Sequence, residues 1–321
     1  MALRVDWAPA YELVLSLNSF LHCSRGAHSL VELGQSWVTS VRALLPEDLR
    51  QQLSRTAVAK SFKEHEIDRL ILLAGAAPGA RDASSFVDWF AGLTPGAAYE
   101  YLAPNAPEPG PQLPRDFLSW RDSMAEVLAG WNSSYFSTLD PAVLNGLQRA
   151  SASLGKRLPV ADPVGLVDEV TNGVLVEPSP SMRQVILVPQ YHNRPYNDSV
   201  EVRDGTLLMF PCDVLPADPR LPPPRLMRLT HALSDESRLR MLRFLANGPC
   251  SLTEVARQVG LSQPTVHHHL TQLRVAGLVR VHFSDACSSR YSLRPHALEQ
   301  LSSQLGSYLL SDVEKVEKHN A

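Results

Sequence analysis

The sequence lacks most of the features that mark secreted or membrane proteins. Only four cysteines occur in 321 residues, and no two of them lie within ten positions, so there is neither a CxxC metal motif nor a dense disulfide framework. No apolar run approaches the roughly 18 residues that a membrane-spanning helix needs. The N-terminal stretch around Asp6 and Glu12 lacks the basic start of a secretory signal. We therefore expect a cytoplasmic protein with reduced thiols and no membrane partner.

Signatures of common enzyme classes are also missing. The chain contains no glycine-rich phosphate loop, no HExxH and no GxSxG. We expect no enzyme activity, no catalytic residues and no cofactor. An enzyme built from distant residues and controlled by a second domain stays open as an alternative.

The net charge of −3 conceals an uneven distribution. Residues 1–224 carry 18 Lys and Arg against 25 Asp and Glu, whereas residues 225–300 carry 10 Arg against 5 acidic residues. The second region also holds six of the eleven histidines. A basic block within an acidic chain predicts a polyanion-binding module joined to a second domain.

Composition and periodicity predict a mainly α protein with small β elements. Residues 1–214 form a helical regulatory or dimerisation domain that ends in a small sheet at about residues 173–211. Asp140-Pro141 and Asp162-Pro163 predict helix starts, and Asp204-Gly205 predicts a hairpin. A proline-rich linker covers residues 215–224, a DNA-binding domain residues 225–311 and a charged tail residues 312–321.

The spacing after residue 234 predicts a helix-turn-helix. Ser234 is the expected cap of a first helix, with Leu239, Leu242 and Leu245 on its buried side. Ser251-Leu252-Thr253-Glu254 is a capping box that starts the next helix, which ends at Gly260. Ser262 then caps a third helix after a very short turn, as a helix-turn-helix requires.

The third helix presents a polar outer face of the kind that enters the major groove of DNA. Val266, Leu270 and Leu273 form its buried side, and His269 lies toward that packed side. The chain beyond Gly277 alternates like a hairpin over residues 278–283 and 289–293, which predicts a wing. The predicted DNA contacts are Gln263, Pro264, Thr265, His267, His268, Thr271 and Gln272 on the helix, with Arg280 and Arg290 on the wing strands.

Three segments, residues 234–242, 261–270 and 273–279, carry a specific resemblance. They resemble the ArsR-type winged helix-turn-helix family of bacterial transcriptional regulators, and the wing strands match that family as well. The resemblance covers about residues 225–310. It implies a homodimer that binds a palindromic double-stranded DNA operator, with one recognition helix in each of two successive major grooves, and it favours a repressor.

Many members of this family sense metals, but both familiar sites are altered here. One site would use cysteines where this chain has Ser251 and Thr253, with Cys250 displaced by one position. The other would use Asp and His where this chain has Pro295 and Ala297 beside His296. The consecutive residues His267, His268 and His269 point 100° apart on a helix and cannot share one ion. We therefore expect no metal site.

Two further regions carry predictions. The stripe Leu298, Leu301, Leu305 and Tyr308 is predicted to form the dimer contact, with packing on the same chain as the alternative. The loop containing Tyr191, His192 and Arg194 is suited to an anionic ligand or an interdomain contact, with a capped surface loop as the alternative.

We expect a DNA-binding regulator that a small-molecule effector or a partner protein modulates through the N-terminal domain. A winged helix that binds a protein instead of DNA is the remaining alternative.

Overall fold

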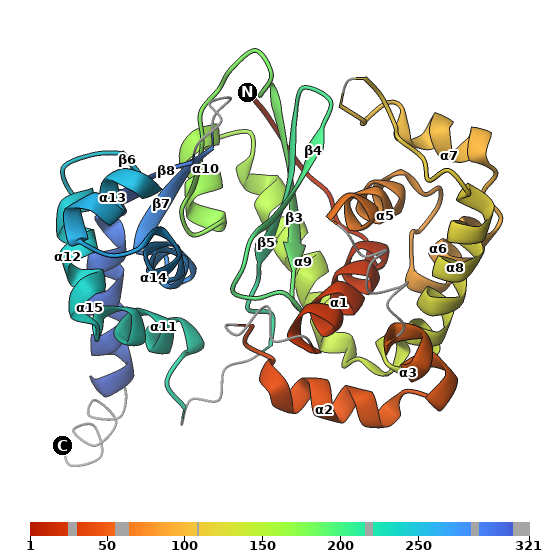
Figure 1. Cartoon of the computed structure of the whole chain (residues 1–321), viewed down its shortest axis with the longest axis horizontal. Helices are drawn as coiled ribbons and strands as arrows, with labels where there is room; N and C mark the ends of the chain where they lie inside the picture. Colours follow the sequence, from red (N-terminus) through yellow and green to blue (C-terminus); the bar gives the residue numbers. More distant parts are fainter. Residues whose placement is uncertain (25–30, 55–63, 108, 216–220, 284–288, 311–321) are drawn as a thin grey trace, which may run out of the picture. The chain divides into compact units, whose positions relative to one another are not determined.

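The chain divides into two compact units. A computed structural model describes residues 1–24, 31–54, 64–107, 109–215, 221–283 and 289–310 (Figure 1). Unit 1 consists of Met1–Val160 and Pro180–Leu215, and unit 2 of Ala161–Ser179 and Pro216–Ala321. Half of the predicted linker, the wing tip with Cys287 and the charged tail lie outside the described residues.

Both units are mainly α-helical with one small sheet each, which confirms the predicted fold class. The division between them differs from the predicted boundary at residue 214. Ala161–Ser179 follows the long helices of unit 1 in sequence but belongs to unit 2. Within the described residues, no helix has the length and apolar character needed to cross a membrane.

The helices of unit 1 begin where the sequence provides capping side chains. The Asp140 side chain accepts a hydrogen bond from Ala142 N, and Pro141 occupies the first turn, as predicted. The helices are α1 (Pro9–Ser24), α2 (Gly34–Leu44), α3 (Glu47–Ser54), α5 (Glu64–Ala76), α6 (Ala83–Ala91), α7 (Pro95–Leu102), α8 (Phe117–Ser134), the 3-10 turn Phe136–Thr138 and α9 (Pro141–Arg157).

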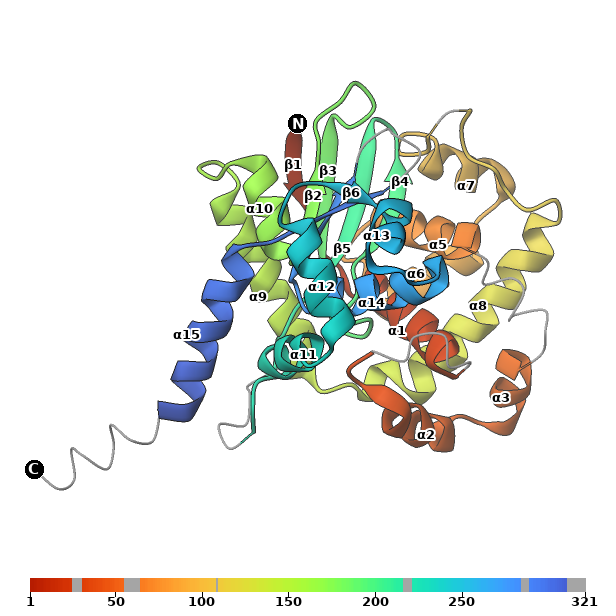
Figure 2. The same cartoon turned by 60° about the vertical axis from the view of Figure 1, so that its left-hand side comes forward.

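A four-stranded sheet runs through unit 1 in the order β1-β3-β5-β4 (Figure 2). Its strands are β1 (Ala2–Val5), β3 (Gln184–Gln190), β4 (Asp198–Val202) and β5 (Gly205–Pro211). The β4–β5 hairpin is confirmed, with Asp204 at φ 58 in its turn. The pairings of β1 with β3 and of β3 with β5 are parallel, which the sequence pattern did not indicate.

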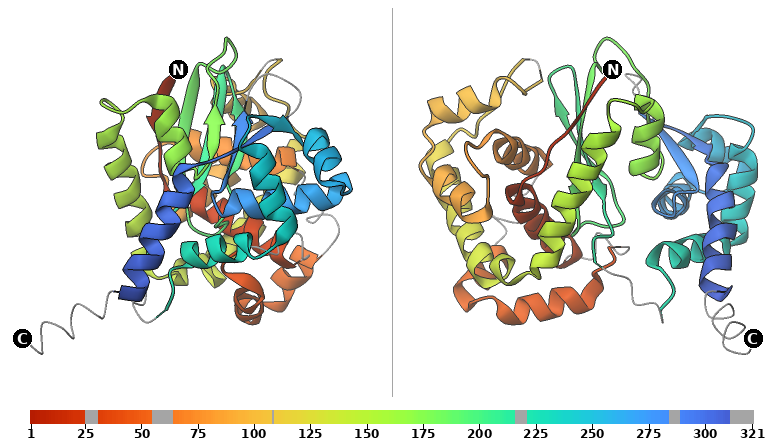
Figure 3. Two further views of the ribbon diagram at one scale, coloured as in Figure 1. Left: turned by 90° about the vertical axis from the view of Figure 1, so that its left-hand side faces the viewer. Right: turned by 180° about the vertical axis from the view of Figure 1, so that it is seen from behind.

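Helices cover both faces of this sheet. α9 contacts β1 and β3 on one face, whereas α1 and α5 contact β3 and β4 on the other (Figure 3). The largest buried side chains, including Trp131 and Phe90, lie in the helical layer beside α1. This burial explains why β3 and β5 read as nearly continuous apolar runs.

Unit 2 is a winged helix-turn-helix with an added helix and strand. Its sheet has the order β2-β7-β8-β6, in which β2 pairs parallel to the wing strand β7. The elements are α10 (Pro163–Val170), β2 (Val174–Val176), α11 (Pro224–Leu233), α12 (Glu236–Leu245), β6 (Cys250–Ser251), α13 (Leu252–Val259), α14 (Gln263–Val275), β7 (Val279–Phe283), β8 (Arg290–Leu293) and α15 (His296–Leu310).

The start of α12 differs from the prediction. Asp235, not Ser234, caps this helix, and its side chain accepts a hydrogen bond from Arg238 N. The buried side consists of Arg238, Met241, Leu242 and Leu245, and Leu239, which the sequence placed on that side, is 48% exposed because it lies roughly 100° away from it. Both residue types are good caps, which is why the sequence pattern did not distinguish them.

Arg238 holds three helices of unit 2 together. Its buried guanidinium donates to the carbonyl oxygens of Ala232 (2.7 Å) and His231 (2.8 Å) at the end of α11. It also donates to Gln272 Oε1 (2.5 Å) on α14. A buried charge is tolerated when its hydrogen-bonding capacity is used in this way.

We predict that Arg238→Met lowers the free energy of unfolding by about 3 kcal/mol, because three acceptors lose a charged donor. Urea unfolding followed by circular dichroism measures the change. Arg240→Met is the matched control on the exposed side of α12 and should stay within about 0.5 kcal/mol of the parent. Equal destabilisation by both variants would contradict this account.

Candidate nucleic-acid interface

The helix-turn-helix of α13 and α14 forms as its caps predict. Ser251 and Glu254 make the reciprocal capping box at the start of α13. Gly260 ends α13 in the left-handed region at φ 73, a conformation that glycine adopts without steric cost. Ser262 then accepts a hydrogen bond from Thr265 N and starts α14. The short turn fixes the direction of α14 relative to α13.

One side of α14 is buried and the opposite side is open. Val266, Leu270 and Leu273 pack in the core of unit 2, as predicted. Five of the seven predicted contact residues on this helix are exposed, and the other two are partly buried. The exposed residues are Gln263, Pro264, Thr265, His267 and His268, and the partly buried ones are Thr271 and Gln272. The helix therefore offers a polar surface that begins at its N-terminal end.

Several of these side chains already have partners within unit 2. The Thr265 hydroxyl lies 2.8 Å from that of Ser262, and the Gln263 amide donates to Thr253 Oγ1 at 3.4 Å. Gln272 accepts from Arg238, and its amide nitrogen lies 2.9 Å from His268 Nε2. Gln272 thus links the buried Arg238 to the exposed His268. The sequence showed no sign of this role for Arg238.

His269 has a different environment from its two neighbours. Its side chain is mostly buried, and its Nδ1 lies 3.9 Å from Asp235 Oδ1. His269 thus lies toward the packed side of α14, as its position in the helical pattern of the sequence predicts. His269 therefore belongs to the support of the helix and not to its open face.

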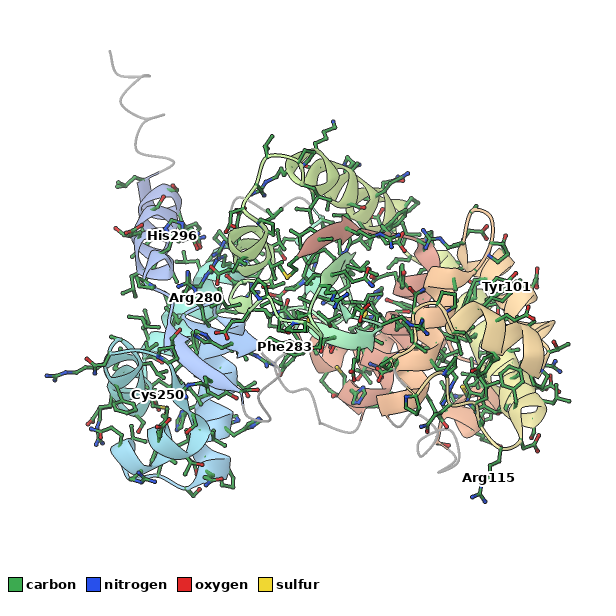
Figure 4. All side chains as sticks on the ribbon, turned by 90° about the horizontal axis from the view of Figure 1, so that it is seen from above. Tyr101, Arg115, Cys250, Arg280, Phe283 and His296 are labelled. Atoms are coloured by element: carbon green, nitrogen blue, oxygen red, sulfur yellow. The ribbon has the colours of Figure 1, made fainter. Side chains whose placement is uncertain are left out.

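The two wing arginines occupy different environments. Arg290 at the start of β8 is exposed and donates to Pro249 O at 2.6 Å. Arg280 in β7 is labelled in Figure 4. It donates to both carboxylate oxygens of Asp168, at 2.9 and 3.1 Å. In this structure the predicted DNA contact Arg280 is therefore paired with a carboxylate of α10.

The α10–β2 segment is the part of unit 2 that the sequence did not reveal. Besides Arg280, Asp168 accepts from Arg294 Nε at 3.3 Å, and Arg294 also donates to Asn172 Oδ1 at 2.8 Å. Asn172 packs against Gly277, where any side chain would collide with it. Strand β2, which we predicted as part of the N-terminal sheet, instead extends the wing sheet. A local sequence pattern cannot predict a pairing between residues that lie more than 100 positions apart.

Helix α15 carries the predicted dimer residues and is largely open. Leu301 packs on the core of unit 2, whereas Leu298 and Leu305 are 44% and 38% exposed. Tyr308 is partly buried. α15 contacts α11, where Met227 is also exposed. Leu301 thus packs on its own chain, and the dimer contact through the exposed side of the stripe stays a prediction.

The loop with Tyr191, His192 and Arg194 is buried inside unit 1. The carboxylate of Glu12 accepts hydrogen bonds from the backbone N–H groups of Tyr191 and His192 and pairs with His192 Nδ1 at 2.5 Å. His192 Nε2 lies 2.7 Å from the Tyr135 hydroxyl. Arg194 lies over the Tyr191 ring and donates to Glu32. These side chains hold the sheet to α1, and neither a surface loop nor a free anion site describes them.

The positions that would bind metals in the resembled family have other roles here. Ser251 caps α13, and Thr253 accepts from Gln263. Burial raises the pKa of the Cys250 thiol, which disfavours its thiolate form. Among the described residues, no group of three His, Cys, Asp or Glu side chains is placed to hold a metal ion.

Comparison with known proteins identifies this part of the chain. The chain is 39% identical over 69 residues to the HTH-type transcriptional regulator KmtR of Mycobacterium tuberculosis, which covers 22% of this chain and 52% of KmtR. It is 46% identical over 48 residues to NmtR of the same organism, covering 15% of this chain and 40% of NmtR. The chain thus spans about half the length of these curated relatives or less.

A solved structure and a family model extend the comparison. The cadmium metal sensor CmtR from Mycobacterium tuberculosis is 35% identical, with a TM-score of 0.21, and the match covers 24% of this chain and 80% of CmtR. The model of the family described as bacterial regulatory protein, arsR family, matches residues 235–281. These residues run from the cap of α12 through α13 and α14 into the wing strand β7. Residues 235–281 are therefore a helix-turn-helix domain of the arsR family of bacterial regulatory proteins.

Proposed function

We propose that this protein is a DNA-binding transcriptional regulator that places α14 in the major groove of duplex DNA. The observation that carries this proposal is the open polar face of α14 within an arsR-family domain. His267, His268 and Gln263 offer hydrogen-bonding groups of the kind that read base edges or phosphates. The exposed Arg290 on the wing supplies a phosphate contact beside the recognition helix.

The charge distribution supports this function. The excess of basic over acidic residues lies in residues 225–300, which contain all the proposed contacts. Arginine–phosphate contacts release condensed counterions, so affinity should fall steeply as salt rises. The acidic unit 1 does not suit a polyanion, which restricts the proposed DNA surface to unit 2.

We further propose a homodimer on a palindromic operator, joined through α15 and α11. The exposed Leu298, Leu305 and Met227 on two helices in contact support this assignment. Two symmetric copies would bring two α14 helices to successive major grooves. Repression follows if the occupied operator overlaps a promoter.

Unit 1 is proposed to modulate DNA binding in response to a small-molecule effector or a partner protein. The chain passes between the two units three times, at residues 160/161, 179/180 and 215/216. Two of these passages flank α10–β2, which pairs with the wing. A conformational change in unit 1 can therefore act on the proposed DNA-binding surface through both ends of residues 161–179, in addition to the proline-rich linker. The cytoplasm is the proposed site of action.

We predict that the double variant His267→Ala with His268→Ala weakens binding to the operator. Each lost base contact costs about 1–3 kcal/mol and relaxes one operator position. The operator is first isolated by selecting genomic fragments bound by the full chain, and affinity is then measured by fluorescence anisotropy. Gln51→Ala, which changes an exposed polar side chain on α3 of unit 1, is the control and should bind normally. Full affinity of the double variant would place the recognition surface elsewhere.

We predict that Leu305→Glu converts the dimer to a monomer, because it introduces a charge into an apolar contact. Sedimentation equilibrium of the full chain measures the mass, and operator affinity should fall together with it. Leu118→Glu, an exposed leucine on α8 of unit 1, should change neither. An unchanged mass for Leu305→Glu would show that α15 is not the dimer contact.

A further inference from the structure

The carboxylate of Asp168 serves two arginines that differ in exposure. The side chain of Arg294 is 3% exposed and that of Arg280 is 32% exposed, and both lie within 3.3 Å of the carboxylate. Both partners come from the arsR-like part of unit 2, whereas Asp168 comes from α10. Asp168 therefore pairs with one arginine that is buried and with another that is partly exposed to water.

The pair with Arg294 is a structural anchor. A guanidinium removed from water needs an anionic partner, and its loss leaves an uncompensated buried charge. Arg294 also donates to the Asp168 backbone oxygen at 3.2 Å and to Asn172 Oδ1 at 2.8 Å. Contacts of this kind do not exchange while unit 2 is folded.

The pair with Arg280 is exchangeable. Water reaches the Arg280 side of this pair, whereas the Asp168 side chain is 10% exposed and keeps Arg294 as a partner when Arg280 leaves. Arg280 offers both Nε and Nη2 to the carboxylate, which is the fork that arginine also presents to a phosphate. A DNA phosphate can therefore replace the carboxylate without loss of hydrogen bonds on the arginine.

The position of this carboxylate is coupled to unit 1 through the chain. α10 and β2 lie within residues 161–179, and the chain belongs to unit 1 on both sides of that segment. β2 pairs with β7 over only three residues, Val174–Val176. The side chains of Val174 and Val176 are buried, so β2 holds α10 beside the wing strand.

We propose that Asp168 is an internal competitor of DNA phosphate for Arg280. With the carboxylate in place, the wing binds DNA through Arg290 and without Arg280. When Arg280 turns away from Asp168, which stays paired with Arg294, Arg280 adds one phosphate contact in each subunit. This inference rests on the proposed DNA-binding function and names a means of its regulation.

The test is the salt dependence of operator affinity in the full chain, which counts phosphate contacts. Asp168→Asn should steepen the slope of log K against log salt by about 0.9 per subunit and tighten binding about tenfold at low salt. Adding Arg280→Gln to Asp168→Asn should remove the gain, whereas Arg280→Gln alone should leave the slope unchanged. Arg290→Gln is the matched control and should lower the slope equally with and without Asp168→Asn.

The other possible results distinguish a failure of this inference from a failure of the proposed function. An unchanged slope for folded Asp168→Asn, with a lowered slope for Arg290→Gln, overturns the inference but keeps the proposed function. A lowered slope for Arg280→Gln alone also overturns it, because Arg280 would then already contact DNA. Absence of DNA binding by the folded parent chain refutes the proposed function itself. If Asp168→Asn unfolds, Asp168→Asn with Arg294→Met removes both buried charges and carries the same expectations.

Discussion

The ion pair between Asp168 and Arg294 connects the DNA-binding unit to a distant part of the chain. A buried guanidinium must have an anionic partner, and Arg294 finds it 126 residues earlier in the sequence. The winged helix is therefore joined to α10 and β2 by this ion pair and by the pairing of β2 with β7. The helix-turn-helix is thus not a module attached to unit 1 only by a linker.

The recognition helix depends on a second buried arginine. Arg238 connects α11 and α12 to Gln272 of α14, and Gln272 in turn contacts His268 on the open face. Its hydrogen bonds fix the direction of α14 from within, while the caps at Ser251 and Ser262 fix its start. A rigid support of this kind would present the exposed polar side chains of the proposed DNA surface in one orientation.

The sequence correctly predicted the features that depend on interactions between nearby residues. The capping box at Ser251, the turn at Gly260, the phase of α14 and the hairpin at Asp204 all depend on residues a few positions apart, and the structure contains them. It did not predict the parallel pairing of β1 with β3, the transfer of β2 to the wing sheet or the role of Asp168. These arise from residues 100 or more positions apart, where neither spacing nor periodicity carries information.

The most direct test of the central claim is a hydroxyl-radical footprint of the full chain on a genomic fragment that it selects. A dimer with one α14 in each of two successive major grooves predicts two protected stretches whose centres lie about 10 base pairs apart, related by symmetry. A single unsymmetrical stretch would contradict the dimeric arrangement. No protection at any salt concentration at which the chain is folded would contradict DNA binding through α14.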